Sequence, residues 1–379
     1  MGSVLFVTWD GGGNVPPALG IATELARRGH AVRFLGHPSQ WEAFTGVGFT
    51  AEEFRHARRW SVTEAAGMTA AAMRYAGVFT DRGMGKDLVE SVTRTTTDLV
   101  VIDSLLFGAM AGAARAGTRY SLLVHTLYSA TFKTFVRGPL GLSARLRGFD
   151  PAALYRSAEH IIAATLKEID YGASRRILYT GPVLSAAAVG GGATRGESAD
   201  NSGDLLVLVS LSTTYISGQA DALQRILDAV DGLAVRAVVT TGPAIDPAAL
   251  TAPLNAEVHR FLPHARVMPT ASLVVSHGGH ATTMLALAHD LPQLIMPMNP
   301  FFDQPVIARA LSDRNVGRTL PKNAPVSDIR TTIEHMLTDL DRYRDNAARL
   351  GTLVRAQDGA AAAADVLMSD CPSLASSRL

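Results

Sequence analysis

The sequence predicts an α/β protein with two domains, each built on a parallel sheet covered by helices. The chain has 379 residues, more than one ordinary hydrophobic core usually contains. Short apolar runs alternate with helical patterns in both halves, which is typical of parallel strands joined by crossover helices. Between the halves, residues 185–203 are mostly Gly, Ala, Ser and Asn without hydrophobic periodicity, which is typical of a linker.

These patterns set the expected domain boundaries. The N-terminal domain covers residues 1–184, the linker 185–203, and the C-terminal domain 204–356. Residues 357–379 include an alanine run with high helix propensity, so we expect a C-terminal helix and tail that can pack back on the N-terminal domain.

The composition excludes several classes of protein. A hydrophobic content of 47% with 18% charged residues is typical of a folded globular chain. The net charge of +1 without a basic run argues against nucleic-acid binding. Cys371 is the only cysteine, which indicates a reducing, cytoplasmic compartment. We find neither a secretory signal nor an apolar run of about eighteen residues, so no membrane partner is expected.

The N-terminal half begins with a βαβ pattern. Residues 3–9 are predicted to form a buried strand, a helix follows from Pro16–Pro17 to Arg28, and a second strand covers 31–35. Residues 51–96 carry scattered large apolar side chains that form either core or a pocket for a bulky apolar ligand. The remaining elements predicted here are strands at 98–102, 120–124, 160–163 and 177–179 and a helix at 106–116.

The C-terminal half repeats the alternation. The predicted strands are 205–209, 235–239, 257–261 and 273–275, and the predicted helices are 219–230, 302–311, 326–338, 340–355 and part of 357–368.

A dinucleotide site is the first function to consider, because three glycines follow the first strand. The third small residue of the dinucleotide motif is replaced by Pro16, and the second strand ends in Leu35-Gly36-His37 without a carboxylate for a ribose. The sequence therefore argues against NAD or FAD. No His/Cys/Asp/Glu spacing is typical of a metal site, and we expect neither a metal nor a cofactor.

The most informative stretch is SLVVSHGGHATTMLALAHDLPQLIMPMNPFFDQ, residues 272–304. A short buried strand leads into His277-Gly278-Gly279, and a helix follows from about Ala281. The start of such a helix has free backbone N–H groups and the positive end of the helix dipole, which favour an anion such as phosphate. Glycine lets the backbone approach that anion closely.

These residues resemble the nucleotide-sugar signature of the family-1 glycosyltransferases with the GT-B fold, most closely the actinobacterial enzymes that decorate natural products. The match continues through Leu291-Pro292-Gln293, Pro297, Asp303-Gln304 and Gly317, and residues 4–36 resemble the family's first βαβ unit. The resemblance implies two Rossmann-like domains that face each other across a cleft. It also implies an inverting transfer of a sugar from a nucleoside diphosphate to an apolar or aromatic small molecule.

The resemblance also implies roles for individual residues. The donor would contact the phosphate loop, a loop after the first strand of the second domain, a base-holding loop and an aspartate–glutamine pair that binds the sugar. These donor residues are Ser212, Thr213, Phe261, Leu262, His277, Gly278, Gly279, His280, Ala281, Thr282, Asp303 and Gln304. The residues expected at the acceptor are Trp9, Gly13, Asn14, Phe54, Met68 and Phe79.

Two departures from the family pattern affect the donor and the catalytic base. Leu285 stands where plant enzymes have a ribose-binding glutamate, so we favour a dTDP-sugar, with a deoxysugar, over a UDP-sugar. Asn14 stands where the family has its catalytic histidine, and an amide cannot act as a general base. His125 is our first candidate for that role, followed by Asp103, where the family has its histidine-orienting aspartate, and by Asp10.

Several alternatives remain open from the sequence. The acceptor could be a phenol or carboxyl group that needs little help, or an aromatic carbon that yields a C-glycoside. The chain could instead be a nucleotide-sugar-binding helper of a partner transferase, or a GT-B fold UDP-sugar epimerase. The sequence leaves the acceptor, the sugar, the bond type and the choice between monomer and homodimer undetermined.

Overall fold

The computed structural model describes residues 2–172, 176–189 and 205–369, apart from the side chains of residues 68, 186 and 187. The chain divides into two compact units. Unit 1 comprises Met1–Val62, Gly67–Val183 and Gln357–Leu379, and unit 2 comprises Thr63–Ala66 and Leu184–Ala356. Cys371 and most of the expected linker lie outside the described residues.

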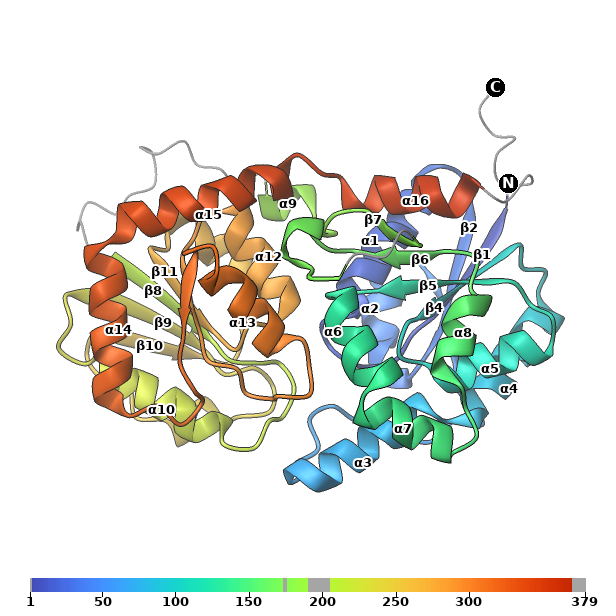
Figure 1. The fold of residues 1–379 in the computed structure, drawn as a ribbon, viewed down its shortest axis with the longest axis horizontal. Coiled ribbons are helices and arrows are strands. Elements are labelled where there is room, and N and C mark those ends of the chain that lie inside the picture. Colours follow the sequence, from blue (N-terminus) through green and yellow to red (C-terminus); the bar gives the residue numbers. More distant parts are fainter. Residues whose placement is uncertain (1, 173–175, 190–204, 370–379) are drawn as a thin grey trace. The chain divides into compact units, whose positions relative to one another are not determined.

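Unit 1 contains a seven-stranded sheet in the order β3-β2-β1-β4-β5-β6-β7, with every strand pair parallel (Figure 1). The strands are β1 (Ser3–Val7), β2 (Ala31–Gly36), β3 (Thr50–Glu53), β4 (Leu99–Asp103), β5 (Tyr120–Val124), β6 (Ile161–Ala163) and β7 (Ile177–Tyr179). The α-helices of this unit are α1 (Val15–Arg27), α2 (Trp41–Thr45), α3 (Met68–Phe79), α4 (Arg82–Arg94), α5 (Phe107–Arg115), α6 (Tyr128–Thr131), α7 (Pro139–Leu146), α8 (Pro151–Ser157) and α16 (Gly359–Ser369).

Two predictions for this sheet were wrong in detail. Strand β1 ends at Val7 rather than at Trp9, because the carbonyl of Trp9 accepts hydrogen bonds from the side-chain amides of Asn14 and Gln40 and the chain leaves the ladder. Strand β3 was not predicted, since its sequence TAEE is a polar edge strand without an apolar run.

Unit 2 contains a six-stranded parallel sheet in the order β10-β9-β8-β11-β12-β13. Its strands are β8 (Leu205–Ser210), β9 (Val235–Thr240), β10 (Ala256–His259), β11 (Leu273–Ser276), β12 (Gln293–Ile295) and β13 (Gly317–Thr319). Its α-helices are α9 (Ala186–Val189), α10 (Gln219–Val230), α11 (His264–Val267), α12 (His280–Ala288), α13 (Gln304–Ser312), α14 (Val326–Thr338) and α15 (Leu340–Arg355). Strands β12 and β13 were not predicted, because three residues are too few to show a period.

The strand order reverses once in each sheet. In unit 1, β1 lies between β2 and β4, so the chain runs outward from β1 to β3 and then returns to form β4 on the other side of β1. In unit 2, β8 lies in the same way between β9 and β11. The carboxyl ends of the strands at such a reversal are where α/β proteins bind ligands, so β1/β4 and β8/β11 identify the two places to examine.

The C-terminal segment belongs to unit 1. Helix α16 packs along α1, and Arg28 at the end of α1 pairs with Asp365 at 2.6 Å and donates to the carbonyl of Ala361. Ala363, Ala364 and Leu367 complete the hydrophobic core on this face of the sheet.

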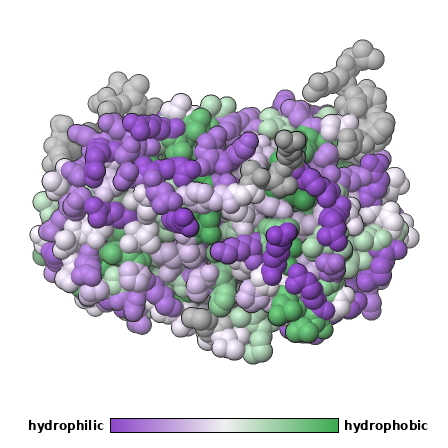
Figure 2. All heavy atoms as spheres, viewed as in Figure 1, coloured by the Kyte–Doolittle hydropathy of each residue, from purple (hydrophilic) through white to green (hydrophobic). Residues whose placement is uncertain are grey.

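Figure 2 shows hydrophilic side chains over most of the drawn face, with separate hydrophobic patches among them. One of these patches lies at the position of α7, where Leu142 and Leu146 are 55% and 83% exposed. Across the described part of the chain, no helix is long and apolar enough to cross a membrane.

Helices α4 and α5 approach each other closely through glycines. A Cβ atom on Gly112 would lie 2.4 Å from the Cα atom of Gly85, and one on Gly85 would lie 2.5 Å from the carbonyl oxygen of Gly108. Contacts this short cannot exist, so any side chain at these positions would force α4 and α5 apart.

We predict that Gly112→Ala destabilises unit 1, because the added methyl group must push the two backbones apart. The expected loss is about 1–3 kcal/mol in the free energy of unfolding, measured by urea denaturation. Gly77→Ala in α3 is the matched control: nothing lies within 4 Å of its Cβ position, so the higher helix propensity of alanine should stabilise α3. If Gly112→Ala and Gly77→Ala unfold at the same urea concentration, close packing at Gly112 does not contribute to stability.

Candidate functional site

The loop between β11 and α12 has a shape that requires glycine. Gly278 has a φ angle of +80°, and a Cβ atom there would meet Cγ2 of Ile295 at 2.8 Å. Helix α12 begins at His280 with Gly279 as its N-cap, and no side chain caps it. His280 is buried, whereas Ala281 is exposed and Thr282 is half-buried. The first-turn amides and the positive end of the helix dipole are therefore uncapped at the start of α12, which is the arrangement that favours an anion.

His277 packs directly on this loop. A Cβ atom on Gly279 would come within 2.5 Å of Nε2 of His277, so the glycine makes room for the imidazole ring. Desolvation lowers the pKa of His277 to about 4, although the backbone of Ser210 partly offsets this effect. The ring is therefore neutral near pH 7, and one of its nitrogens carries a proton that it can donate.

Ser212 and Thr213 follow β8, the neighbour of β11 at the strand-order reversal. The Ser212 hydroxyl accepts from the amide of Thr214 at 3.0 Å, and the Ser212 carbonyl accepts from Gln219. These bonds hold the loop in shape. Ser212 is buried and Thr213 is exposed, so Thr213 presents the side chain that a ligand can reach.

The loop after β12 contains Asp303 and Gln304. Oε1 of Gln304 accepts from the amides of Met298 and Asn299 at 2.8 and 2.9 Å, and the side chain is buried. Its oxygen thus fixes the loop. Asp303 occupies the N-cap position of α13 but its side chain makes no capping hydrogen bond, and it is half-buried. The backbone of Gln304 also packs on Gly278, which joins this loop to the phosphate loop.

The loop after β10 carries an exposed aromatic ring. Strand β10 ends at His259 rather than at the predicted Phe261, so Phe261 lies in the loop, and it is 74% exposed. Leu262 packs with Leu285 of α12 on one apolar cluster. His264, which was not predicted, lies 3.2 Å from the Thr240 hydroxyl, and burial lowers its pKa.

In unit 1, Asn14 is fixed by hydrogen bonds to both of its side-chain polar atoms. Its Nδ2 atom, which carries two hydrogens, lies within hydrogen-bond distance of three acceptors: the Thr8 hydroxyl at 3.1 Å, the Trp9 carbonyl at 2.9 Å and Oδ2 of Asp103 at 3.0 Å. Its Oδ1 atom accepts from the amide of Gly11 at 3.1 Å, and the side chain is 1% exposed. Asn14 is therefore a buried structural hub at the ends of β1 and β4.

Asp103 links Asn14 to His125. Oδ1 of Asp103 accepts from the amide of Leu105 at 3.0 Å, and Oδ2 lies 3.2 Å from Nδ1 of His125. The His125 side chain is 16% exposed and that of Asp103 is 5% exposed. The sequence thus correctly grouped Asn14, Asp103 and His125, which come from the ends of three adjacent strands.

An aromatic cluster adjoins Asn14. The Trp9 ring contacts the rings of Trp60, Tyr75 and Phe79 at centroid distances of 5.6, 6.1 and 5.0 Å, and Phe79 contacts Phe135 at 5.6 Å. Trp9 and Phe79 are almost completely buried, so they form the base of the cluster rather than its surface. Trp60 and Tyr75 are half-buried.

The other residues expected at the acceptor differ from this cluster. Phe54 is buried against the His37 ring at 5.2 Å, and Gly13 is exposed with no atom within 4 Å of its Cβ position. The side chain of Met68 lies outside the described part. Phe135 was missed because it belongs to η2 (Phe132–Arg137), a π-helical segment that no sequence period indicates.

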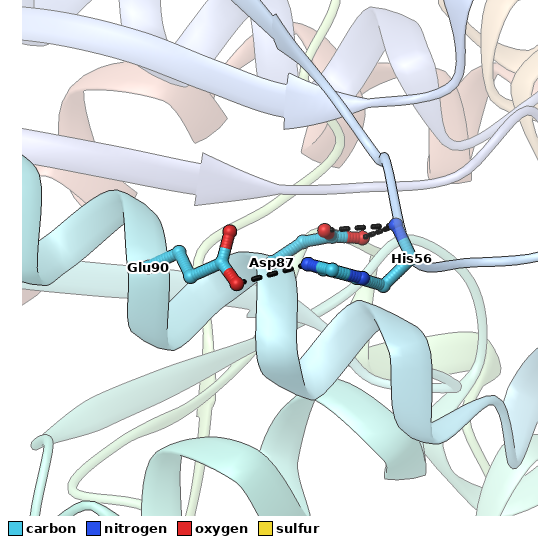
Figure 3. A group of neighbouring side chains, drawn as sticks. All are labelled: His56, Asp87 and Glu90. Carbon is cyan, nitrogen blue, oxygen red and sulfur yellow. Dashed lines mark hydrogen bonds and ion pairs between the residues drawn. The ribbon is translucent and has the colours of Figure 1, made fainter.

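His56, Asp87 and Glu90 form a group of potential metal ligands in unit 1 (Figure 3). Nε2 of His56 lies 2.9 Å from Glu90, and both carboxylate oxygens of Asp87 accept from the amide of His56. The amide of Ala57 donates to Asp87 as well. Because backbone donors already occupy Asp87, the group is explained as an anchor for this loop.

Comparisons with known proteins agree with this geometry. The family described as erythromycin biosynthesis protein CIII-like, C-terminal domain, matches residues 224–367. The 4'-demethylrebeccamycin synthase of Lentzea aerocolonigenes is 25% identical over 96% of this chain and 98% of its own length. The crystal structure of the glycosyltransferase of kitacinnamycin has a TM-score of 0.78 at 20% identity, covering 98% of this chain and 99% of that one. A glycosyltransferase in complex with dTDP has a TM-score of 0.71 at 18% identity, covering 96% and 98% of the two chains.

Two α/β units with these parallel sheets define the GT-B fold, which confirms the predicted fold class. The chain is thus similar over nearly its whole length to glycosyltransferases of this fold, and its residues 224–367 match the family model named above.

Because backbone amides already donate to the Asp87 carboxylate, we predict that this group does not bind a metal ion. Adding EDTA or Zn²⁺ should leave the thermal unfolding midpoint unchanged, because metal binding would have to displace backbone donors from a buried carboxylate. Differential scanning fluorimetry measures this. A midpoint that rises with Zn²⁺ in the wild type but not in Glu90→Ala would show that the group binds metal.

Proposed function

We propose that the chain is an inverting glycosyltransferase of natural-product biosynthesis that uses a nucleoside diphosphate sugar as donor. Unit 2 binds the donor and unit 1 binds an apolar or aromatic small molecule. The activities of the similar proteins named above support this proposal, and the geometry of unit 2 supports the identity of the donor.

The observation that carries the proposal is the order of the side chains along the edge of the second sheet. Phe261 follows β10, Thr213 follows β8, His277 follows β11 and Asp303 follows β12, and these strands lie in that order with β9 between the first two. A nucleoside diphosphate sugar has its parts in the same order. The base can stack on Phe261, the diphosphate can accept hydrogen bonds from the backbone amides and from the neutral imidazole of His277, and the sugar hydroxyls can donate to Asp303. Four strand spacings of about 4.8 Å give about 19 Å, which suits such an extended molecule.

Leaving-group stabilisation follows from this placement. Negative charge grows on the diphosphate as the bond to the sugar breaks, and the fixed amides at the start of α12 are donors that need no reorganisation. We propose that these donors and His277 take the place of a metal ion. Attack from the side opposite to the diphosphate would invert the anomeric carbon.

The preference for a deoxynucleotide rests on Leu285. This side chain packs with Leu262 on an apolar cluster beside the base-holding loop, so it offers no carboxylate to the two ribose hydroxyls of a UDP-sugar. Thymidine has no 2′-hydroxyl and does not need that partner. We therefore favour a dTDP-sugar as the donor, and propose a deoxysugar as the group transferred.

The acceptor proposal rests on the half-buried rings of the aromatic cluster. Trp60 and Tyr75 are held by buried rings behind them and by the guanidinium of Arg74, which lies 5.3 Å from the centroid of the Trp60 ring. Preorganised aromatic surfaces favour flat, apolar ligands.

A transfer assay tests the proposed function. The purified chain is incubated with dTDP- and UDP-sugars and a panel of polyphenols and polyketide aglycones, with His277→Ala as the control. We expect a glycosylated product and free nucleoside diphosphate from the wild type, with the dTDP-sugar preferred. Product only after a partner transferase is added would support the helper function, and conversion of a UDP-sugar without an acceptor would support an epimerase.

A double-mutant cycle tests the contact between His277 and Gly279. Gly279 has a φ of −65°, which alanine adopts readily, so the only conflict in Gly279→Ala is with the His277 ring. We predict about 10- to 100-fold weaker dTDP binding in each single variant, as expected for a hydrogen bond to a charged group. Isothermal titration calorimetry should show no further loss in the double variant. Additive losses would mean that the ring does not contact the diphosphate.

A further inference from the structure

We propose that His125 is the proton acceptor of the transfer reaction, that Asp103 orients it, and that Asn14 positions Asp103. The inference rests on the proposed function, because it concerns the acceptor of that reaction. It comes from the juxtaposition of a buried amide, a buried carboxylate and a partly exposed imidazole at the ends of β1, β4 and β5.

Asn14 cannot itself accept the proton. Its amide has no basic nitrogen, and both of its polar atoms are already bonded within the fold. The direction of these bonds also fixes its orientation, because Nδ2 faces acceptors and Oδ1 faces the amide of Gly11. What the side chain supplies is an N–H donor that holds Oδ2 of Asp103 in place.

Asp103 in turn faces His125. Its Oδ1 atom is held by the amide of Leu105 and its Oδ2 atom by Asn14, so the carboxylate cannot rotate away from the imidazole at 3.2 Å. The distance is that of an ion pair, although the ring is not aligned for a linear hydrogen bond. Catalytic hydrogen bonds often tighten only when substrate binds. A carboxylate on Nδ1 favours the tautomer whose Nε2 atom is the proton acceptor.

The neighbouring titratable groups fit this role less well. Burial raises the pKa of Tyr128 on α6 to about 12 and raises the pKa of Tyr155 on α8, so both stay neutral. Burial lowers the pKa of His37, whose Nδ1 already accepts from the amide of Asp10. The carboxylate of Asp10 accepts from the Ser39 hydroxyl at 2.7 Å, and it is the competitor that we test.

The step balances without an external reagent. The acceptor hydroxyl gives its proton to Nε2 of His125 as its oxygen bonds to the anomeric carbon. The bond from that carbon to the diphosphate breaks, and the electron pair leaves with the diphosphate. The imidazolium, paired with the Asp103 carboxylate, then releases its proton to solvent.

Kinetics of His125→Ala test the assignment. We expect kcat to fall by about 10²- to 10⁴-fold while the KM for the donor stays nearly constant. The decrease in kcat should be smaller for an acidic acceptor such as a nitrophenol than for an aliphatic alcohol, because an acidic hydroxyl loses its proton more easily without a base. His335→Ala, an exposed histidine of unit 2, is the control and should behave as the wild type.

The pH profile separates catalysis from structure. In the wild type, kcat/KM should decrease as the pH falls through the histidine range between about 5 and 8. This decrease, the acid limb of the profile, should be absent in His125→Ala. In Asp103→Asn the limb should move to lower pH, because the charge that favours the imidazolium is gone. Asn14→Ala should lower kcat through loss of positioning and be partly restored by Asn14→Gln. Melting curves verify that each variant is folded.

The outcomes are distinguishable. If folded His125→Ala shows the turnover and the pH profile of the wild type, His125 is not the proton acceptor. If Asp10→Asn instead loses the decrease of kcat/KM at low pH, the proton acceptor is Asp10. Absence of any product from the wild type across the panel would count against the proposed function itself.

Discussion

The reversal of strand order at β1/β4 and at β8/β11 is the constraint on which the candidate site of each unit depends. Parallel strands place all their carboxyl ends at one edge, and the reversal sends the connecting helices to opposite sides, which leaves that edge open. In unit 2 the open edge receives the start of α12. In unit 1 it receives Asn14, Asp103 and His125. The chemistry therefore follows from topology before any side chain is considered.

The strand, glycine turn and helix of the proposed donor site could be predicted from the sequence because these elements are local. A strand, two glycines and a helix follow one another within residues 273–288, so the chain path itself defines the anion site. The roles of single side chains were less predictable. The oxygen of Gln304 bonds to backbone amides of its own loop and Ser212 caps a turn, and such contacts depend on a loop conformation that no residue pattern encodes.

The acceptor half was predictable only in part, because its contacts are distant in sequence. Asn14 and Asp103 are 89 positions apart, and their pairing was predicted only from the resemblance to a family whose histidine and aspartate stand at these positions. The aromatic residues were the harder case. Trp9 and Phe79 are buried at the base of the cluster, whereas Trp60 and Tyr75 lie nearer the surface. Hydrophobicity alone cannot distinguish the two layers, and Phe135 reaches the cluster through a π-helical segment.

Asn14 shows why one residue can change without the loss of its site. A buried carboxylate such as Asp103 needs hydrogen-bond donors, since burial without them costs several kcal/mol. An amide at position 14 supplies a donor at 3.0 Å as an imidazole would, so the carboxylate keeps its place. The amide cannot take up a proton, so in the proposed reaction a basic group that shares the same carboxylate is the natural replacement. Oδ2 of Asp103 faces such a group in His125, and the single fixed carboxylate thereby joins a structural asparagine to a histidine that follows β5.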